Sequence, residues 1–91
     1  MMDAAPSDSI ILEVKQVASK VPGVTGIDKC HVRKMGFDYF IDLHVEVDGD
    51  LSVFEGHEIS HRVKETILEA IPGVMDVLIH IEPKRKTVDS Q

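Results

Sequence analysis

The apolar residues of this chain follow two periods, and the change from one to the other separates strands from helices. Apolar and polar residues alternate over residues 39–48 and again over residues 74–82, which is the pattern of a strand with one buried face. A third strand is expected over residues 25–35, followed by a hairpin turn at Gly36-Phe37-Asp38. The pattern therefore predicts three strands, two of them with one apolar and one polar face.

Two other segments carry apolar residues at the spacing of a helical stripe. The first follows a capping signal at residues 7–9 and stops before Pro22-Gly23, and the second opens with the capping box Ser52–Glu55 and stops at Pro72-Gly73. The residues expected to form the two buried stripes are Ile10, Ile11, Val14, Val17, Ala18 and Val21 in the first helix, and Val53, Ile59, Val63, Ile67, Ala70 and Ile71 in the second.

The order of these elements, α-β-β-α-β, predicts an α+β fold of the ferredoxin-like (metallochaperone-like) type. A three-stranded sheet with both helices on one face buries one apolar stripe per element and leaves the other sheet face uncovered. The folded domain is expected over residues 8–83, with a disordered leader at 1–7 and a disordered tail at 84–91.

Length and charge limit what such a domain does. A chain of 91 residues forms one small domain with a thin core, so a second copy that covers the open sheet is expected, and we predict a homodimer. Ten basic and sixteen acidic residues give a net charge of −6, which argues against binding nucleic acid. The single cysteine, Cys30, excludes disulfides within the chain and cysteine-pair metal motifs, and its alternation with Val32 favours a core or interface position.

Two further observations concern the cellular setting. No apolar run approaches the ~18–20 residues of a membrane span, and the first residues are acidic and polar rather than a secretory signal. The expectation is an intracellular domain.

The candidate chemistry lies on the polar face of the strands. If the apolar set of residues 39–48 faces the helices, then Asp42, His44 and Glu46 face outward, and His80 and Glu82 do the same on the last strand. Imidazole and carboxylate together suit zinc and its first-row neighbours. The alternative is that these residues are only the ordinary polar surface of a half-covered sheet.

The remaining histidines are less informative. His57 and His61 are four residues apart in the second helix, a spacing that allows both to contact one metal ion. His57 is expected near the edge of the buried stripe, where it could reach a site at the sheet edge. His61 is rotated toward solvent and is interpreted as a surface histidine, and His31 is undecided.

Five segments in the right order resemble the C-terminal cytoplasmic domain of cation diffusion facilitator (cation efflux) transporters. They are VPGV at 21–24, VRKMG at 32–36, FIDLHVEVDGDLS at 40–52, GHEISHRV at 56–63 and VLIHIEP at 77–83. The resemblance extends over about residues 10–83. It implies a homodimeric domain attached to the transmembrane domain of the same transporter, which this chain lacks, with divalent metal bound at or near the dimer interface.

Carried over residue by residue, the resemblance implies metal binding by His44, His57, His80 and Glu82, with Asp42 as an additional ligand in some members. A further position, often histidine in zinc exporters, is Asp28 here, which makes the ligand set harder. Zinc is the first expectation, and a shift of preference toward iron or manganese is the second.

These features lead to one hypothesis and two alternatives. The hypothesis is a regulatory cytoplasmic domain of a divalent metal transporter that couples metal binding to transport. The first alternative is a metal-independent dimerisation module or a small-molecule sensor on the same fold. The second, a metal-dependent hydrolase, lacks support because no phosphate loop, nucleophile elbow or HExxH motif is present, so we expect no enzyme.

Overall fold

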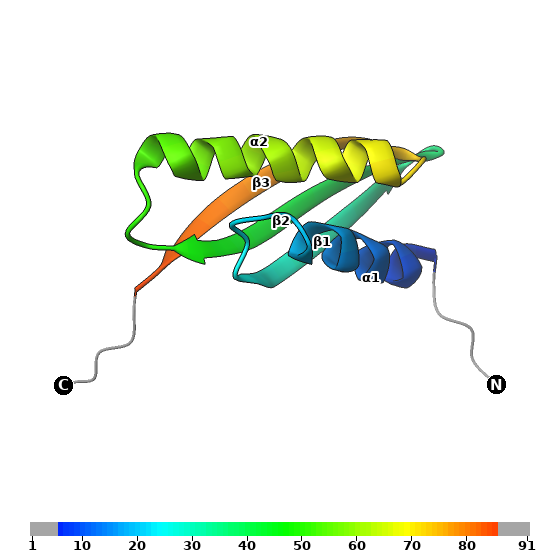
Figure 1. The fold of residues 1–91 in the computed structure, drawn as a ribbon. Coiled ribbons are helices and arrows are strands. Elements are labelled where there is room, and N and C mark those ends of the chain that lie inside the picture. Colours follow the sequence, from blue (N-terminus) through cyan, green and yellow to red (C-terminus); the bar gives the residue numbers. More distant parts are fainter. Residues whose placement is uncertain (1–5, 86–91) are drawn as a thin grey trace.

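A computed structural model of the chain describes residues 6–85, and side-chain positions from residue 8 onward. The elements are α1 (Pro6–Ser19), β1 (Gly26–Met35), β2 (Asp38–Asp48), α2 (Val53–Ala70) and β3 (Val74–Lys84), as Figure 1 shows. This order confirms the predicted α-β-β-α-β architecture. Helix α1 already includes residues 6 and 7, and β3 extends to residue 84. The rest of the expected leader and tail, residues 1–5 and 86–91, lies outside the described residues.

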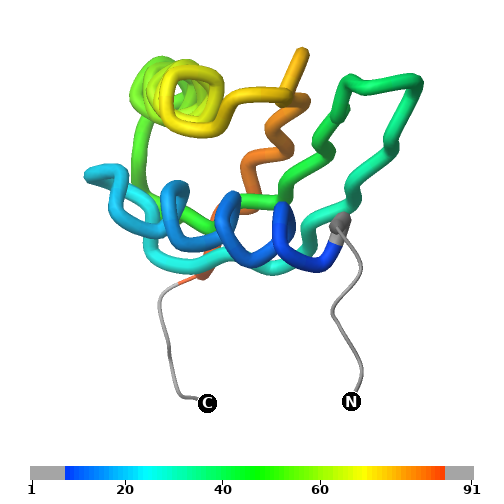
Figure 2. Tube along the Cα trace, turned by 90° about the vertical axis from the view of Figure 1, so that its right-hand side faces the viewer, coloured from blue at the N-terminus to red at the C-terminus, as the bar shows by residue number. Residues whose placement is uncertain are grey.

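The three strands form one sheet in the order β1-β2-β3. Strand β2 is antiparallel to β1 across the hairpin and parallel to β3, because a parallel neighbour requires a crossover and α2 provides it. Helix α2 runs along the sheet (Figure 1), and Figure 2 looks along its axis with α1 lying below it. The outer edge of β3 pairs with no other strand among the described residues.

The core lies between the helices and one face of the sheet. The aliphatic side chains of β2 are almost completely buried, whereas its polar ones are only half-buried. The members of the core are Val14, Ala18, Val21, Ile41, Leu43, Val45, Val47, Ile59, Val63, Ile67, Ile71, Val74 and Val77. No helix of residues 6–85 has the length and apolar character needed to cross a bilayer.

Helix α2 departs from its predicted stripe at both ends. The capping box is present, with Glu55 N–H donating to Ser52 Oγ at 3.0 Å. However, Val53 is 91% exposed and Ala70 is exposed as well, so their expected burial is wrong. Val53 and Ala70 are the first and last residues of the helix. In the first turn the buried residue is Gly56, which lies near Ile81 of β3.

A bulge at the start of β3 also shifts the predicted alternation. Val74 pairs with Tyr39, but the next pair joins Phe40 to Asp76, so Met75 is an extra residue on β3. Val74 and Val77 are therefore both buried while Met75 is 55% exposed. From Val77 onward the alternation follows the prediction, and His80 and Glu82 lie on the outward side.

Candidate metal centre on the open face of the sheet

The outward-facing residues of β2 and β3 lie side by side on the face that no helix covers. His44 is paired in register with His80, and Glu46 with Glu82. Their neighbours in the chain, Leu43 and Val45, are fully buried on the helix side. The predicted outward orientation of the polar set is therefore confirmed.

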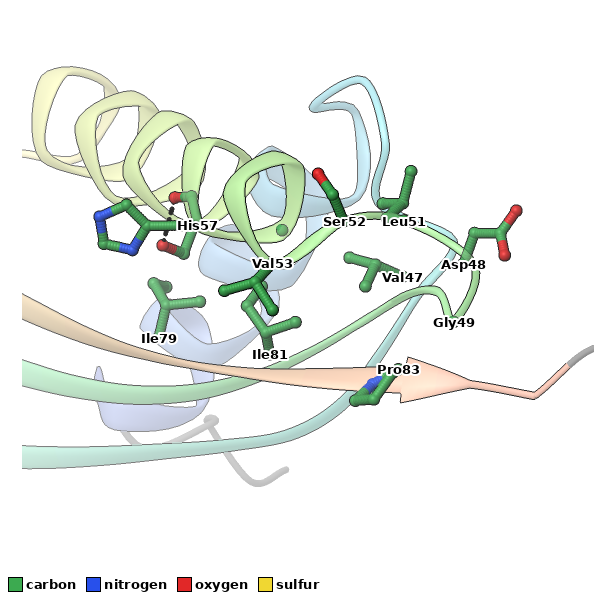
Figure 3. A pocket seen from close by; sticks show the side chains of 12 residues that line it. Val47, Asp48, Gly49, Leu51, Ser52, Val53, His57, Ile79, Ile81 and Pro83 are labelled. Atoms are coloured by element: carbon green, nitrogen blue, oxygen red, sulfur yellow. Dashed lines mark hydrogen bonds between the residues drawn. The ribbon is translucent and has the colours of Figure 1, made fainter.

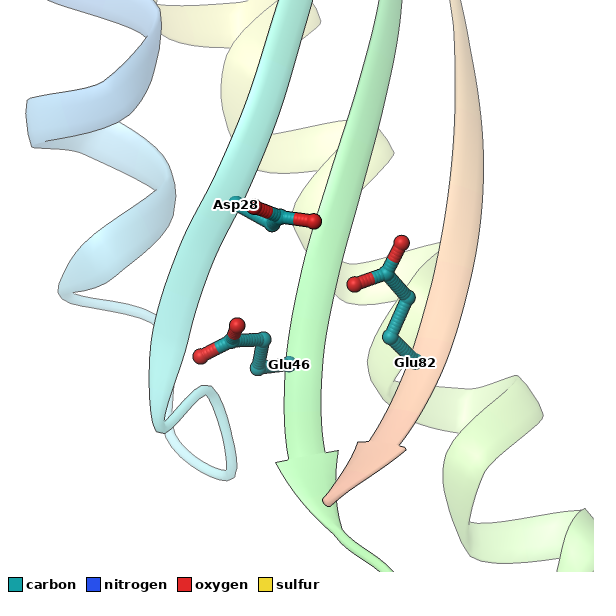
Figure 4. Close-up of side chains that lie close together, drawn as sticks. All are labelled: Asp28, Glu46 and Glu82. Atoms are coloured by element: carbon teal, nitrogen blue, oxygen red, sulfur yellow. The ribbon is translucent and has the colours of Figure 1, made fainter.

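Three carboxylates from three adjacent strands converge at one end of this face. Asp28 of β1, Glu46 of β2 and Glu82 of β3 each offer an oxygen, and these oxygens lie within 4.8 Å of one another. Figure 4 shows Asp28 and Glu82 reaching toward β2 from the strands on either side, with the Glu46 carboxylate turned toward β1. We call this group the carboxylate cluster. At this spacing unscreened negative charges repel one another, which a divalent cation would relieve.

A bulge in β1 accounts for the position of Asp28. Ile27 pairs with Val45, but the next registered pair joins Cys30 to Leu43, so three steps along β1 match two along β2. The extra residue lies at Asp28 and Lys29. Because of it, Ile27 and Cys30 both face the helices, while Asp28 remains on the open face.

Gly26, which has no side chain, leaves the space that the Glu46 side chain occupies. The two residues are paired in register, and a Cβ added to Gly26 would collide with Glu46 Oε1. The Glu46 side chain therefore lies across the glycine, where it is only 24% exposed. Lys84 Nζ approaches Glu46 Oε1 at 3.7 Å and offsets part of the negative charge.

The two histidines of the open face are attached to the cluster through Glu82. His44 Nδ1 lies 2.6 Å from Glu82 Oε2, a hydrogen bond in which the imidazole donates. His44 and His80 stack, with ring centroids 4.4 Å apart and planes 11° from parallel. A carboxylate that fixes one imidazole nitrogen also orients the other, as is common around metal sites.

Two of the residues implied by the resemblance lie apart from this group. Asp42 is paired with Arg33, with Nη2 and Oδ1 3.8 Å apart, so a cation already accompanies its charge. His57 lies on α2 and lines a groove together with Ile79 and Ile81, which face the helices rather than the open face. Within one chain the structure thus brings together Asp28, His44, His80 and Glu82, but not Asp42 or His57.

Glu46 was missing from the expected ligand set. The alternation of β2 placed it on the open face, but its contact with Asp28 and Glu82 depends on the bulge in β1 and on the parallel register of β3. Its strongest sequence signal was its position two residues after His44, matching the spacing of His80 and Glu82.

An apolar groove lies beside His57, between α2 and β3. Its volume is about 510 Å³, and Figure 3 shows Val53 and His57 of α2 facing Ile79 and Ile81 of β3 across it. Val53 is 91% exposed and the neighbouring Phe54 is 71% exposed. An apolar surface of this kind at a free sheet edge is typical of an interaction site.

Two ionisable groups near these elements have shifted pKa values. Burial raises the pKa of the Cys30 thiol, partly opposed by the positive charge of Lys15, and the residue packs against the core as predicted. A hydrogen bond from Lys64, with a second from the Val77 N–H, lowers the pKa of Asp76. The Lys64–Asp76 pair, 3.1 Å apart, links α2 to β3. Neither group belongs to the carboxylate cluster.

Known proteins similar to this chain share both its sequence pattern and its fold. The family model described as "cation efflux protein, cytoplasmic domain" matches residues 6–84. The cation-efflux pumps FieF of Salmonella newport and Salmonella typhimurium are each 31% identical over 83 residues, which is 91% of this chain. The chain spans only 27% of the length of these pumps.

Among solved structures, the MamM C-terminal domain superposes closely. A methionine-to-leucine variant gives a TM-score of 0.86 with 25% identity, over 88% of this chain and 100% of that one. A cysteine-to-serine variant gives 0.85 with 25% identity, over 88% and 99%.

Proposed function

Because this chain belongs to the family of cation efflux protein cytoplasmic domains, we propose that it is a regulatory domain that binds a divalent cation on its open sheet face. In this proposal the cation joins two copies of the domain, and their closure is coupled to transport by a membrane-embedded part of the same transporter. The observation that carries the proposal is the convergence of Asp28, Glu46 and Glu82 beside His44.

The donor chemistry of the open face fits a divalent first-row ion. The carboxylate cluster supplies three hard oxygen donors, and His44 and His80 supply imidazole nitrogens next to them. Mixed nitrogen and oxygen sets accept zinc, iron and manganese. A bound cation would supply positive charge that the carboxylates share. With Asp28 in place of a nitrogen ligand, the set is rich in oxygen, which favours manganese or iron(II) more than an all-histidine site would.

The surface beside the open face supports pairing of two copies. The groove lined by Ile79 and Ile81 lies beside β3, an edge strand of the sheet, and Val53 exposes its apolar side chain there. The neighbouring Phe54 is exposed as well. Burying them would add apolar area to a domain whose own core is thin. His57 lies in the same groove, so pairing through this surface would allow it to approach the open face of the partner.

The negative charge of the two domains would couple cation binding to their closure. Each chain carries a net charge of −6, and a paired arrangement would bring two acidic faces together. Repulsion between them favours a separated state, and a cation that both faces share favours a closed one. Such a cation acts only through its higher affinity for the closed state, which is the property that a regulatory domain requires.

A metal-independent function is the second candidate. The apolar groove of about 510 Å³ has the size of a small-ligand site, so a dimerisation module or sensor of an apolar small molecule would use the same surface. In the first function a cation closes the pair of domains, whereas in the second the pair closes without metal.

Metal titration of the 91-residue chain, combined with sedimentation, tests the proposal. Manganese or iron(II) should bind in calorimetry and should compact or strengthen the dimer, and the triple variant D28N/E46Q/E82Q should lose both effects. The matched control Glu69→Gln changes an exposed carboxylate of α2 and should behave as the unmodified chain. A dimer that ignores metal would favour the second candidate, and a monomer under all conditions would contradict both.

A further inference from the structure

His57 and His61 make a second histidine pair, on the exposed side of α2. They lie one helical turn apart, and their Nε2 atoms are 2.9 Å from each other. The rings meet edge to face, with centroids 4.4 Å apart and an angle of 85° between the planes. Both side chains are exposed to solvent.

We propose that His57 and His61 form a separate cation site within one chain, which takes ions of high imidazole affinity such as Cu²⁺, Ni²⁺ and Zn²⁺. Metal–nitrogen bonds of about 2.0–2.1 Å, at angles between square-planar and tetrahedral, require the two nitrogens to be roughly 2.9–3.4 Å apart. The observed 2.9 Å separation already meets this requirement. The backbone of α2 does not need to change, and rotation of the rings turns both Nε2 lone pairs toward the ion.

Binding of an ion to this pair requires one proton to move. In the free pair, the Nε2–H of one ring donates to the Nε2 lone pair of the other. When an ion binds, that proton moves to Nδ1 of the same ring, so that both neutral imidazoles present an Nε2 lone pair. Two metal–nitrogen bonds form and two waters leave the ion, with no net release of protons.

The surroundings favour a cation. Glu58 and Glu65 line a shallow depression with His61, and Arg62 is the positive group there. Two carboxylates against one guanidinium give a locally negative surface next to the pair. Water would complete the coordination, as expected for a chelate with two protein ligands.

This site differs from the open face in its ligands and hence in its selectivity. A two-imidazole chelate should follow the order Cu²⁺ > Ni²⁺ > Co²⁺ > Mn²⁺ steeply, whereas a carboxylate-rich site accepts Mn²⁺. The inference does not rest on the proposed function, because both ligands belong to one helix of one chain. His57 would serve both sites if pairing occurs, so His61 is the residue that separates them.

Ni²⁺ titration of the 91-residue chain, followed by histidine side-chain NMR and by thermal unfolding, tests the site. Ni²⁺ should shift the His57 and His61 ring signals and raise the melting temperature, because a ligand that binds only the folded helix stabilises it. His61→Ala and His61→Gln should each lower Ni²⁺ affinity at least about tenfold and remove the thermal shift.

Three controls make the outcome decisive. His31→Ala removes an exposed histidine of β1 and should leave Ni²⁺ binding intact, as should Glu69→Gln, which changes an exposed carboxylate of α2. Mn²⁺ should not perturb the His61 ring. The proposal is overturned if the His61 variants bind Ni²⁺ like the unmodified chain, or if His31→Ala causes an equal loss.

Discussion

The molecule carries two histidine pairs whose ring centroids are equally far apart, at 4.4 Å, yet the pairs are built in different ways. His44 and His80 come from neighbouring strands, stack nearly parallel, and are held by Glu82. His57 and His61 come from one helix, meet edge to face, and form a hydrogen bond with each other. The first pair depends on the tertiary fold and the second only on the integrity of α2.

The difference in surroundings is as large as the difference in construction. The strand pair adjoins three carboxylates, and the side chain of its His44 is only 27% exposed. The helix pair is exposed and has no carboxylate hydrogen-bonded to it among the described contacts. Similar imidazole spacing therefore occurs beside several oxygen donors in one place and in a pair of nitrogens alone in the other, and the following predictions test this contrast.

The largest effect is expected from Glu82→Gln. This change removes one carboxylate of the cluster and weakens the hydrogen bond that orients His44. Mn²⁺ affinity in calorimetry should fall by about ten- to a hundredfold, while Ni²⁺ binding at the helix pair should not change. Glu69→Gln is the matched control. Equal Mn²⁺ affinity in Glu82→Gln and the control would exclude Glu82 as a ligand.

The next largest effect is expected from lowering the pH, which should reduce metal affinity by different amounts at the two sites. A protonated imidazole binds no cation, so zinc affinity should fall at least about tenfold between pH 7.5 and 5.5, and the closed dimer should open in parallel. The loss should be larger at the helix pair, whose protein ligands are both histidines, than at the open face, where carboxylates contribute. Calorimetry and small-angle scattering at the two pH values measure this. If the dimer closes equally well at pH 5.5, the carboxylates of the open face bind the ion without histidine.

A smaller effect is expected from Gly26→Ala, which acts only through Glu46. The added Cβ would collide with Glu46 Oε1 and force this carboxylate out of its present position near Asp28 and Glu82. Mn²⁺ affinity should fall about fivefold, consistent with displacing rather than deleting one ligand.

Gly56→Ala on α2 is the control for Gly26→Ala, because the nearest atom to its new Cβ is Ile81 Cγ2 at an ordinary 3.9 Å. It should leave Mn²⁺ affinity unchanged. Unchanged affinity in Gly26→Ala as well would mean that Glu46 takes no part in the site.

The contrast between the pairs also explains what the sequence could predict. The spacing of His57 and His61 is local, so a helical period was enough to place them together. The alternation around His44 and His80 correctly assigned both to the open face, because one face of the strand is buried. Their pairing and the carboxylate cluster depend on the strand register.

Two bulges lay beyond the reach of the sequence pattern. The extra residue in β1 at Asp28–Lys29 brings Asp28 to Glu46, and the extra residue at Met75 makes both Val74 and Val77 face inward. A bulge carries no clear periodic signal, because it is the point at which the period breaks. The exposure of Val53 was missed for a related reason, since a helical stripe does not tell which terminal residues of the helix pack against the core.

The smallest predicted effect, a difference in thiol reactivity, tests the β1 bulge directly. Cys30 faces the helices only because of the extra residue, and a slip of one position would expose it on the open face beside His44. Burial raises the pKa of this thiol, so at a given pH less reactive thiolate is present, and the reaction should accelerate only as the pH rises toward that higher value. Alkylation by iodoacetamide at pH 8 should be about threefold slower for Cys30 than for the thiol of a C30A/H31C variant, whose side chain lies on the open face. If Cys30 reacts as fast as the H31C thiol, the strand is not bulged at Asp28. The carboxylate cluster would then lose its β1 member, and the main distinction between the two histidine pairs would rest on Glu46 and Glu82 alone.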